Sequence, residues 1–180
     1  SQLKIKGNYN KKFGLNLKKI SLLSKNNSLI VNELVIDKDN KLSNVDKIDL
    51  NYIDNDNLNN KFIVNRTKNN NYELKGSFLN ADPIISSLLE SKDEQQLNIF
   101  KENIKISLNV SDVYLDENNV IKNLKGKLQI INNKVDQADI SALFDNNKNI
   151  TFSINTKDDE KITTLFSSKA KPLVERYKFI

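Results

Sequence analysis

Hydrophobic and polar residues alternate along most of the second half of the chain. Residues 104–111 read IKISLNVS, so every second position is aliphatic and the positions between carry Lys, Ser or Asn. A period of two residues is typical of a β-strand with one buried and one solvated face. The same alternation returns at 124–130, 138–144 and 150–154, with polar turns between the segments. The pattern predicts long antiparallel strands joined by tight turns.

The first half carries shorter alternating segments, which predict strands near residues 2–6, 13–22, 29–36, 48–52, 62–66 and 72–78. In the second of these, Leu15 and Leu17 have one parity and Ile20 and Leu22 the other. A change of parity inside a strand indicates an extra residue, so we expect a bulge or a turn at Lys18–Lys19.

The period changes to helical spacing at two places, each beside one of the two prolines. Asp82 is suited to cap a helix and Pro83 to its first position, and Ser167 or Ser168 can play the capping role before Pro172. Apolar residues follow both prolines at spacings of three and four. We therefore predict short amphipathic helices at 82–91 and 169–177. We therefore expect two repeated β units, 1–91 and 92–180, which together form one continuous segment of a longer protein.

The predicted fold class is mostly β, with an apolar sheet face that the helices cannot cover. Each helix supplies four or five apolar side chains, each contributing ~1.5–3 kcal/mol when fully buried. Strands of this length present more apolar surface than these side chains can cover. A second sheet, a second copy of the unit, or a ligand must cover the remainder.

Composition narrows the class of partner. The net charge of +5 comes from many lysines, while arginine occurs only at Arg66 and Arg176. The lysines alternate with apolar residues along the strands, which is typical of a solvated face. A nucleic-acid-binding surface more often combines clustered arginine with aromatic residues. We therefore expect no nucleic-acid partner.

Residues for catalysis or metal binding are scarce. The chain has neither His nor Cys, which removes the usual general base, the common transition-metal ligands and disulfides. The DNDN sequence at 54–57 begins like a calcium loop, but Asn59 and Asn65 stand where such a loop needs Gly and Glu. We predict no enzymatic activity, no catalytic residue, no metal site and no cofactor.

The second half resembles the repeating unit of the AsmA-like superfamily, which includes the YhdP and TamB types. The resemblance rests on a long amphipathic strand followed by NVIKNLKGKLQI, KVDQADISALFDNNKNITFSI and KITTLFSSKAKPLVERYKF. In that family a strand ending in Ser leads into a short helix with small residues and paired aliphatics, matched here by Ser167, Ser168, Ala170, Leu173 and Val174. FLNADPIISSLLES resembles the Asp- and Pro-containing helix before the unit. Lys169 and Lys171 depart from the family, which often has Asp and Gly there.

The resemblance implies a curved, groove-like sheet in a bridge-like lipid transfer protein. Such a protein is anchored to the inner membrane of a diderm bacterium, spans the periplasm, and serves outer-membrane biogenesis by phospholipid transport. The implied partners are phospholipid acyl chains, adjacent repeats of the same chain, and the membrane through regions outside this segment. The residues that would line the lipid groove are Ile104, Ile106, Leu108, Val110, Leu124, Leu128, Ile130, Ile140, Phe144, Ile150, Phe152 and Ile154.

Two other functions remain open at this point. The sheet could close on a second sheet as a structural or adhesive β-sandwich, or it could be a scaffold for outer-membrane protein assembly. Alternation is the same in an open sheet and in a sandwich, so it does not separate these hypotheses.

Overall fold

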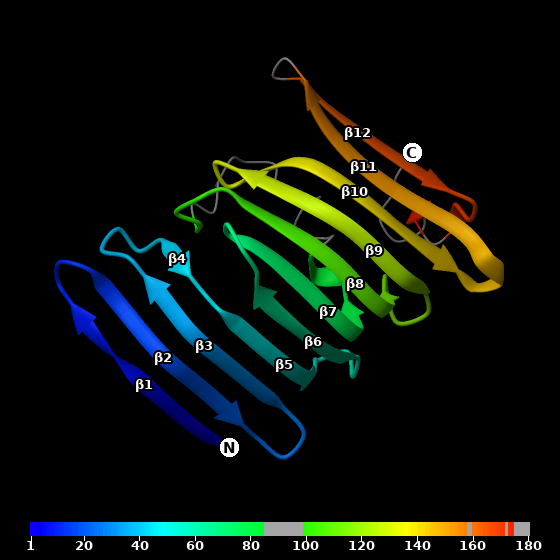
Figure 1. The fold of residues 1–180 in the computed structure, drawn as a ribbon. Helices are drawn as coiled ribbons and strands as arrows, with labels where there is room; N and C mark the ends of the chain where they lie inside the picture. The colour runs from blue at the N-terminus through cyan, green and yellow to red at the C-terminus, as the bar shows by residue number, and fades with distance from the viewer. Residues whose placement is uncertain (85–98, 158–159, 172, 175–180) are drawn as a thin grey trace.

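A computed structural model gives the fold of residues 1–84, 99–157, 160–171 and 173–174. These residues form one curved, open sheet of 12 strands, in which neighbours in sequence are mostly neighbours in space (Figure 1). The sheet order is β1-β2-β3-β5-β6-β7-β8-β9-β10-β11-β12, and β4 pairs with β3 beside this path. The N-terminal strand lies at one edge and β12 at the other (Figure 1).

Apart from the three-residue β4, which was not predicted, the strands have 7 to 12 residues and agree with the alternating segments of the sequence. Their bounds are β1 Gln2–Asn10, β2 Gly14–Leu23, β3 Ser28–Ile36, β4 Leu42–Asn44, β5 Lys47–Ile53, β6 Asn59–Arg66, β7 Asn71–Asn80, β8 Ile104–Tyr114, β9 Val120–Ile131, β10 Lys134–Phe144, β11 Lys148–Lys157 and β12 Glu160–Ser167.

Asparagine makes many of the turns. Asn132 and Asn133 both have positive φ, 51° and 62°, and are the only two residues between β9 and β10. Two successive positive φ angles describe the hairpin turn that matches the twist of the flanking strands. Asparagine tolerates this region better than most residues, so its abundance here has a structural use.

One pair of neighbouring strands is parallel, which corrects the prediction of a wholly antiparallel sheet. β7 and β8 run in the same direction, with Leu74 opposite Leu108. Parallel neighbours need a crossover that returns the chain to the starting end. The crossover ends against β4, where the backbone N–H of Leu42 donates to the carbonyl of Ile99 at 2.6 Å and that of Lys101 to Leu42 at 3.0 Å. The two predicted β units meet at this parallel pair and share one sheet.

The bulge predicted at Lys18–Lys19 is confirmed. Residues on both sides of Lys18 in β2 and Glu33 in β3 are paired, but these two residues are left out of the pairing. Glu33 has a positive φ of 51°. β1 has no extra residue, so its register with β2 shifts between Lys6 and Gly7. Because the extra residue restores the side-chain direction, both parities of leucine and isoleucine in β2 face the same side.

A second line of extra residues crosses β7, β8 and β9, and the sequence reading missed it. Ser77 of β7, Ser111 of β8 and Asn123 of β9 are left out of the residue pairing between these three strands, so the register among them does not change. The register shifts instead where β7 pairs with β6 and where β9 pairs with β10. In β8 the consequence is that Val110 and Val113, at 0% and 1% exposure, belong to the same buried cluster. A regular strand would place residues three apart on opposite faces.

The two amphipathic helices are not found as predicted. The one short helix among the elements is the 3₁₀ turn η1, Asp145–Asn147. Residues 82–84 and 171, 173 and 174 have helical backbone, whereas residues 169 and 170 do not. Residues 85–91, 172 and 175–177 of the two predicted helices lie outside the described residues. Ile84 is 53% exposed and Val174 is 38% exposed, so these turns do not bury the whole predicted stripe, although Leu173 is buried.

The last strand turns two of its apolar residues away from the apolar side chains of β11. Ile162 and Phe166 pair with Asn155 and Thr151 of β11 and are 59% and 57% exposed. Leu165 instead pairs with Phe152. The register with β11 decided this, because residues 162–166 are apolar or Thr on both parities.

Candidate functional site: an apolar face that crosses the sheet

The apolar side chains of successive strands line up in a row perpendicular to the strands. Directly paired residues place their side chains on the same face, so the register identifies the members of the row. The row is Ile5, Ile20, Val31, Ile48, Val64, Leu74, Leu108, Gly126, Ile140, Phe152 and Leu165. It contains one residue from every strand except β4, and no member is polar. We call the side of the sheet that carries this row the apolar face.

A second apolar row runs beside the first from β1 to β9. Its members are Leu3, Leu22, Leu29, Leu50, Phe62, Gly76, Val110 and Leu124. With about 4.8 Å between neighbouring strands, the first row extends over about 48 Å. The apolar face is therefore a continuous stripe that leads from one edge of the sheet to the other.

All twelve residues predicted to line a groove lie on this face, but they are covered to different degrees. Five are buried, namely Ile104, Val110, Phe144, Ile150 and Ile154. Seven are half-buried, namely Ile106, Leu108, Leu124, Leu128, Ile130, Ile140 and Phe152.

The buried part of the face is a cluster near the ends of β7–β11. Val110, Val113, Ile121 and Phe144 pack there with Leu173 from the C-terminal segment. Ala81, which follows β7, packs against the same cluster. Ala81 and Leu173, each within two residues of a proline, thus help to cover one end of the apolar face.

The face becomes more open toward β1. Leu3 and Ile5 are 62% and 58% exposed, and Leu22 of β2 is 41% exposed. All described strands belong to the one sheet, so within the described ranges no second sheet lies over these side chains. Within the described ranges, the apolar side chains at this end of the sheet are therefore open to solvent.

The sequence reading named lining residues only in the second half and missed the first-half part of the face. Ile20, Ile48 and Val64 belong to the same row as Leu108. Their alternation was visible, but the signal is weaker because the strands are shorter and β2 changes parity. Val113 and Ile121 were missed because the shared bulge reverses the parity of β8 and β9.

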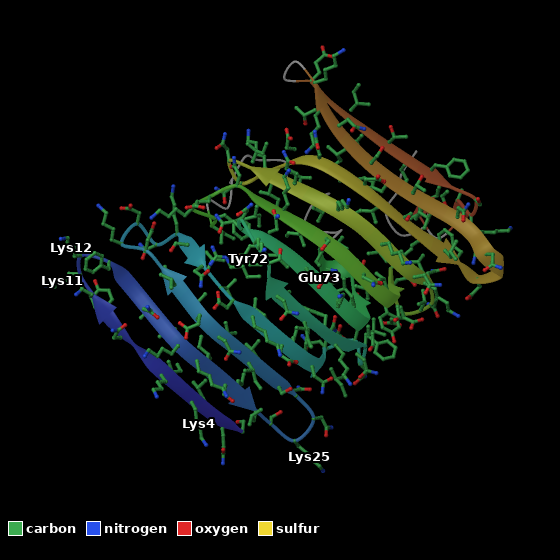
Figure 2. All side chains as sticks on the ribbon, viewed as in Figure 1. Lys4, Lys11, Lys12, Lys25, Tyr72 and Glu73 are labelled. Atoms are coloured by element: carbon green, nitrogen blue, oxygen red, sulfur yellow. The ribbon has the colours of Figure 1, made fainter. Side chains whose placement is uncertain are left out.

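The opposite side, which we call the polar face, carries Lys, Asn, Ser and Asp. Two of its ion pairs join residues of the same strand, Lys47 with Asp49 at 3.4 Å and Lys75 with Glu73 at 2.9 Å, and a third joins Lys122 of β9 to Asp145 of η1 at 3.3 Å. Figure 2 shows Glu73 of the polar face at the centre of the sheet, next to Tyr72, which pairs with Ile106 on the apolar face, and it shows Lys4, Lys11, Lys12 and Lys25 around the β1 margin. Lys4 lies on the polar face and the other three lysines lie in turns, and all four are exposed.

A shallow depression of about 360 Å³ lies mainly on the polar face, around the Ser77–Ser111 bulge. Lys61 and Lys75 border it, together with Asp49 and Asn109. Asp49 and Lys75 are already engaged in ion pairs, so the depression has little uncompensated charge.

The DNDN loop is closed by its own hydrogen bonds. One oxygen of Asp54 accepts the backbone N–H groups of Asp56 and Leu58, and the other accepts the side-chain amides of Asn60 and Asn80 at 3.1 and 2.8 Å. Burial alone raises the pKa of Asp54, but the hydrogen bonds, that from Asn80 foremost, lower it below the ordinary value of 3.8. The carboxylate therefore stabilises the ends of β5, β6 and β7.

Two further polar groups tie the segment before β8 to the first half. The Arg66 guanidinium donates to the side-chain carbonyls of Asn44 and Asn70, and Asn70 donates to Glu102. Asp37 lies 3.4 Å from the ammonium of Lys101, and the N–H of Lys41 is the main cause that lowers the Asp37 pKa. The Arg66 guanidinium and the Asp37 carboxylate therefore both hold neighbouring segments of the chain together, which is a structural role.

No cluster of three or more potential metal-ligating side chains occurs within the described part of the chain. None of its described helices has the length and apolar character to cross a bilayer. No family model, curated protein or solved structure matches the chain. The candidate site is therefore defined by its own geometry, a continuous apolar stripe on an open sheet.

Proposed function

We propose that the apolar face binds phospholipid acyl chains and that the chain is a segment of a lipid conduit of the AsmA-like type. The observation that carries the proposal is the row from Ile5 to Leu165, which crosses the sheet without a polar residue. A conduit needs an apolar path that runs along the direction in which one strand follows another. The two rows supply such a path, and its direction is perpendicular to the strands.

The energetics of the face suit acyl chains. Each methylene moved from water to an apolar surface contributes ~0.8 kcal/mol, so a chain that buries roughly a dozen gains on the order of 10 kcal/mol before ordering costs. The binding is spread evenly along the rows. An even surface allows a chain to slide, because no single contact holds it strongly.

Charge distribution supports the same function. The charged residues of the strands lie mainly on the polar face, and Arg66, at the end of β6, is engaged by Asn44 and Asn70. The proposal therefore includes no head-group specificity and no catalytic step. It includes no cofactor and no nucleic-acid partner.

The cellular setting is part of the proposal. As an AsmA-like segment, the chain would lie in the periplasm of a diderm bacterium, in a protein anchored to the inner membrane by regions outside this segment. Adjacent repeats would extend the apolar face and carry phospholipid between the inner and outer membranes.

Site-specific photocrosslinking in the full-length protein tests the proposal. A crosslinker at Leu108, Leu128 or Phe152, on the apolar face, should capture phospholipid in cells. A crosslinker at Asn109, Lys127 or Ser153 is the matched control, because each control is the sequence neighbour of a test position and lies on the polar face.

The first-half residues sharpen the test. Ile20 belongs to the same row as Leu108, and its neighbour Lys19 lies on the other face. Capture at Ile20 as well as at Leu108 would support a path along the whole row. Equal capture on both faces, or none on the apolar face, would refute lipid binding and favour a sheet covered by protein.

A further inference from the structure

Positive charge without any negative charge is concentrated in β1, β2 and the turns that follow them. All 23 acidic residues of the chain come after residue 32, whereas residues 1–32 contain seven basic ones. These are Lys4, Lys6, Lys11, Lys12, Lys18, Lys19 and Lys25. None of the seven forms an ion pair with a carboxylate of the described residues. We call residues 2–25 the basic hairpin.

Two lysines of the basic hairpin lie directly opposite each other. Lys6 of β1 is paired with Lys19 of β2, and the next residue in that row is the neutral Asn32 of β3. Like charges in directly paired positions destabilise a sheet. In β9, by contrast, Lys127 is paired with Asp139 of β10. An anionic surface beside the hairpin would relieve the repulsion, which no side chain of the hairpin itself can do because it has no Asp or Glu.

The turn between β1 and β2 combines positive charge with an exposed aromatic ring. It consists of Lys11, Lys12 and Phe13, and Figure 2 shows the two lysines together at the tip of the hairpin. Phe13 is 68% exposed, and the Lys12 ammonium lies 5.4 Å from the centre of its ring. The turn lies beyond the strand ends, so a further strand placed beside β1 would run along β1 and leave the turn open.

The next turn on the same side of the sheet, residues 37–41, is different. It has two aspartates and two lysines, and Asp37 also pairs with Lys101 at 3.4 Å. Lysine beside an exposed aromatic residue suits the surface of an anionic membrane, where aromatic rings lie at head-group level and the negative surface potential attracts basic side chains. Nucleic-acid surfaces favour clustered arginine, and the first arginine of the chain is Arg66.

We propose that the tip of the basic hairpin docks on the surface of a membrane that contains anionic phospholipid. Phe13 enters the head-group region, and Lys11 and Lys12 contact lipid phosphates. Lys6 and Lys18 lie four residues from the turn, roughly 13 Å along the strands, so they add a weaker attraction that salt screens over about 8 Å. Docking of this turn does not depend on acyl chains binding to the apolar face, because the two use different surfaces.

Vesicle flotation with the unsubstituted 180-residue chain tests the partner. One set of vesicles is phosphatidylcholine alone, and the other is phosphatidylcholine mixed with phosphatidylglycerol. We expect binding to the anionic vesicles to be at least about tenfold tighter and to weaken as salt rises. Equal binding to both sets, or to neither, would overturn the proposal. Tighter binding to a DNA duplex than to the anionic vesicles, at the same salt concentration, would overturn it in favour of nucleic acid.

A chain with both Lys11→Gln and Lys12→Gln tests the place of contact. Both side chains are exposed, so the fold should be unchanged, and we expect the affinity for anionic vesicles to fall about tenfold or more. The matched control carries Lys125→Gln and Lys127→Gln, which remove the same charge from exposed positions on β9. An equal fall in the control would show that only total charge matters and would overturn the proposal.

Tryptophan fluorescence measures insertion directly, because the native chain has no tryptophan. In Phe13→Trp we expect the emission to shift to shorter wavelength when anionic vesicles are added, since the ring leaves water. Phe166→Trp is the control, because Phe166 is 57% exposed and lies in β12 at the other edge of the sheet. No shift in Phe13→Trp, or an equal shift in both chains, would overturn docking through this turn. Lipid capture at Leu108 tests the apolar face separately, so the two proposals can fail independently.

Discussion

Replacing Val113 by Ala provides the sharpest test of the sheet geometry. Val113 is 1% exposed and belongs to the same buried cluster as Val110, three residues earlier in β8. The substitution removes two methyl-sized groups. At ~0.8 kcal/mol each, transfer accounts for about 1.6 kcal/mol, and the cavity left behind raises the expected loss to about 2–3 kcal/mol.

Urea denaturation of the Val113→Ala, Val110→Ala and Ile162→Ala chains measures the effect. We expect Val110→Ala to cost as much as Val113→Ala, while Ile162→Ala, 59% exposed, changes the free energy of unfolding by less than about 0.5 kcal/mol. For a chain of this size, 2–3 kcal/mol corresponds to a fall in Tm of about 5–10 °C. A loss below about 0.5 kcal/mol for Val113→Ala, with a full loss for Val110→Ala, would mean that β8 alternates regularly and that the shared bulge is absent.

Three further predictions follow from individual contacts. Asp54 has a lowered pKa in the folded chain, so its contribution to stability is present above the ordinary value of 3.8 and is lost as pH falls through the lower folded value. Asp54→Asn should therefore make the free energy of unfolding depend less on pH on the acid side, as measured by urea titration at several pH values. An unchanged pH dependence would contradict this. Gly126→Val should lower stability by about 1–3 kcal/mol in thermal denaturation, because the added Cβ would lie 2.6 Å from the carbonyl oxygen of Asp139; a neutral result would mean that β9 and β10 are farther apart. Leu3→Ser, at a position 62% exposed, should leave the unfolding free energy of the dilute chain within about 0.5 kcal/mol, and a larger loss would show that β1 is covered.

The sequence alone was sufficient for the local structure of most strands. Alternation of Ile106 and Leu108 with Lys105 and Ser107 predicted a strand with two distinct faces, because period two is a property of the extended backbone itself. The parity change at Lys18 predicted the first bulge for the same reason. A polar turn was predicted between the segments 124–130 and 138–144, and Asn132–Asn133 form it, since asparagine tolerates positive φ.

Tertiary structure alone decided how the strands join and what covers them. Alternation is identical in parallel and antiparallel strands, so the β7–β8 pair could not be predicted from Leu74 and Leu108. The second bulge was hidden because Ser77, Ser111 and Asn123 are extra only in relation to their partners. The exposure of the apolar face also depends on whether a facing layer exists, which is a long-range property. The sequence determined which side chains share a face, and register between distant strands decided that those faces join into a single stripe.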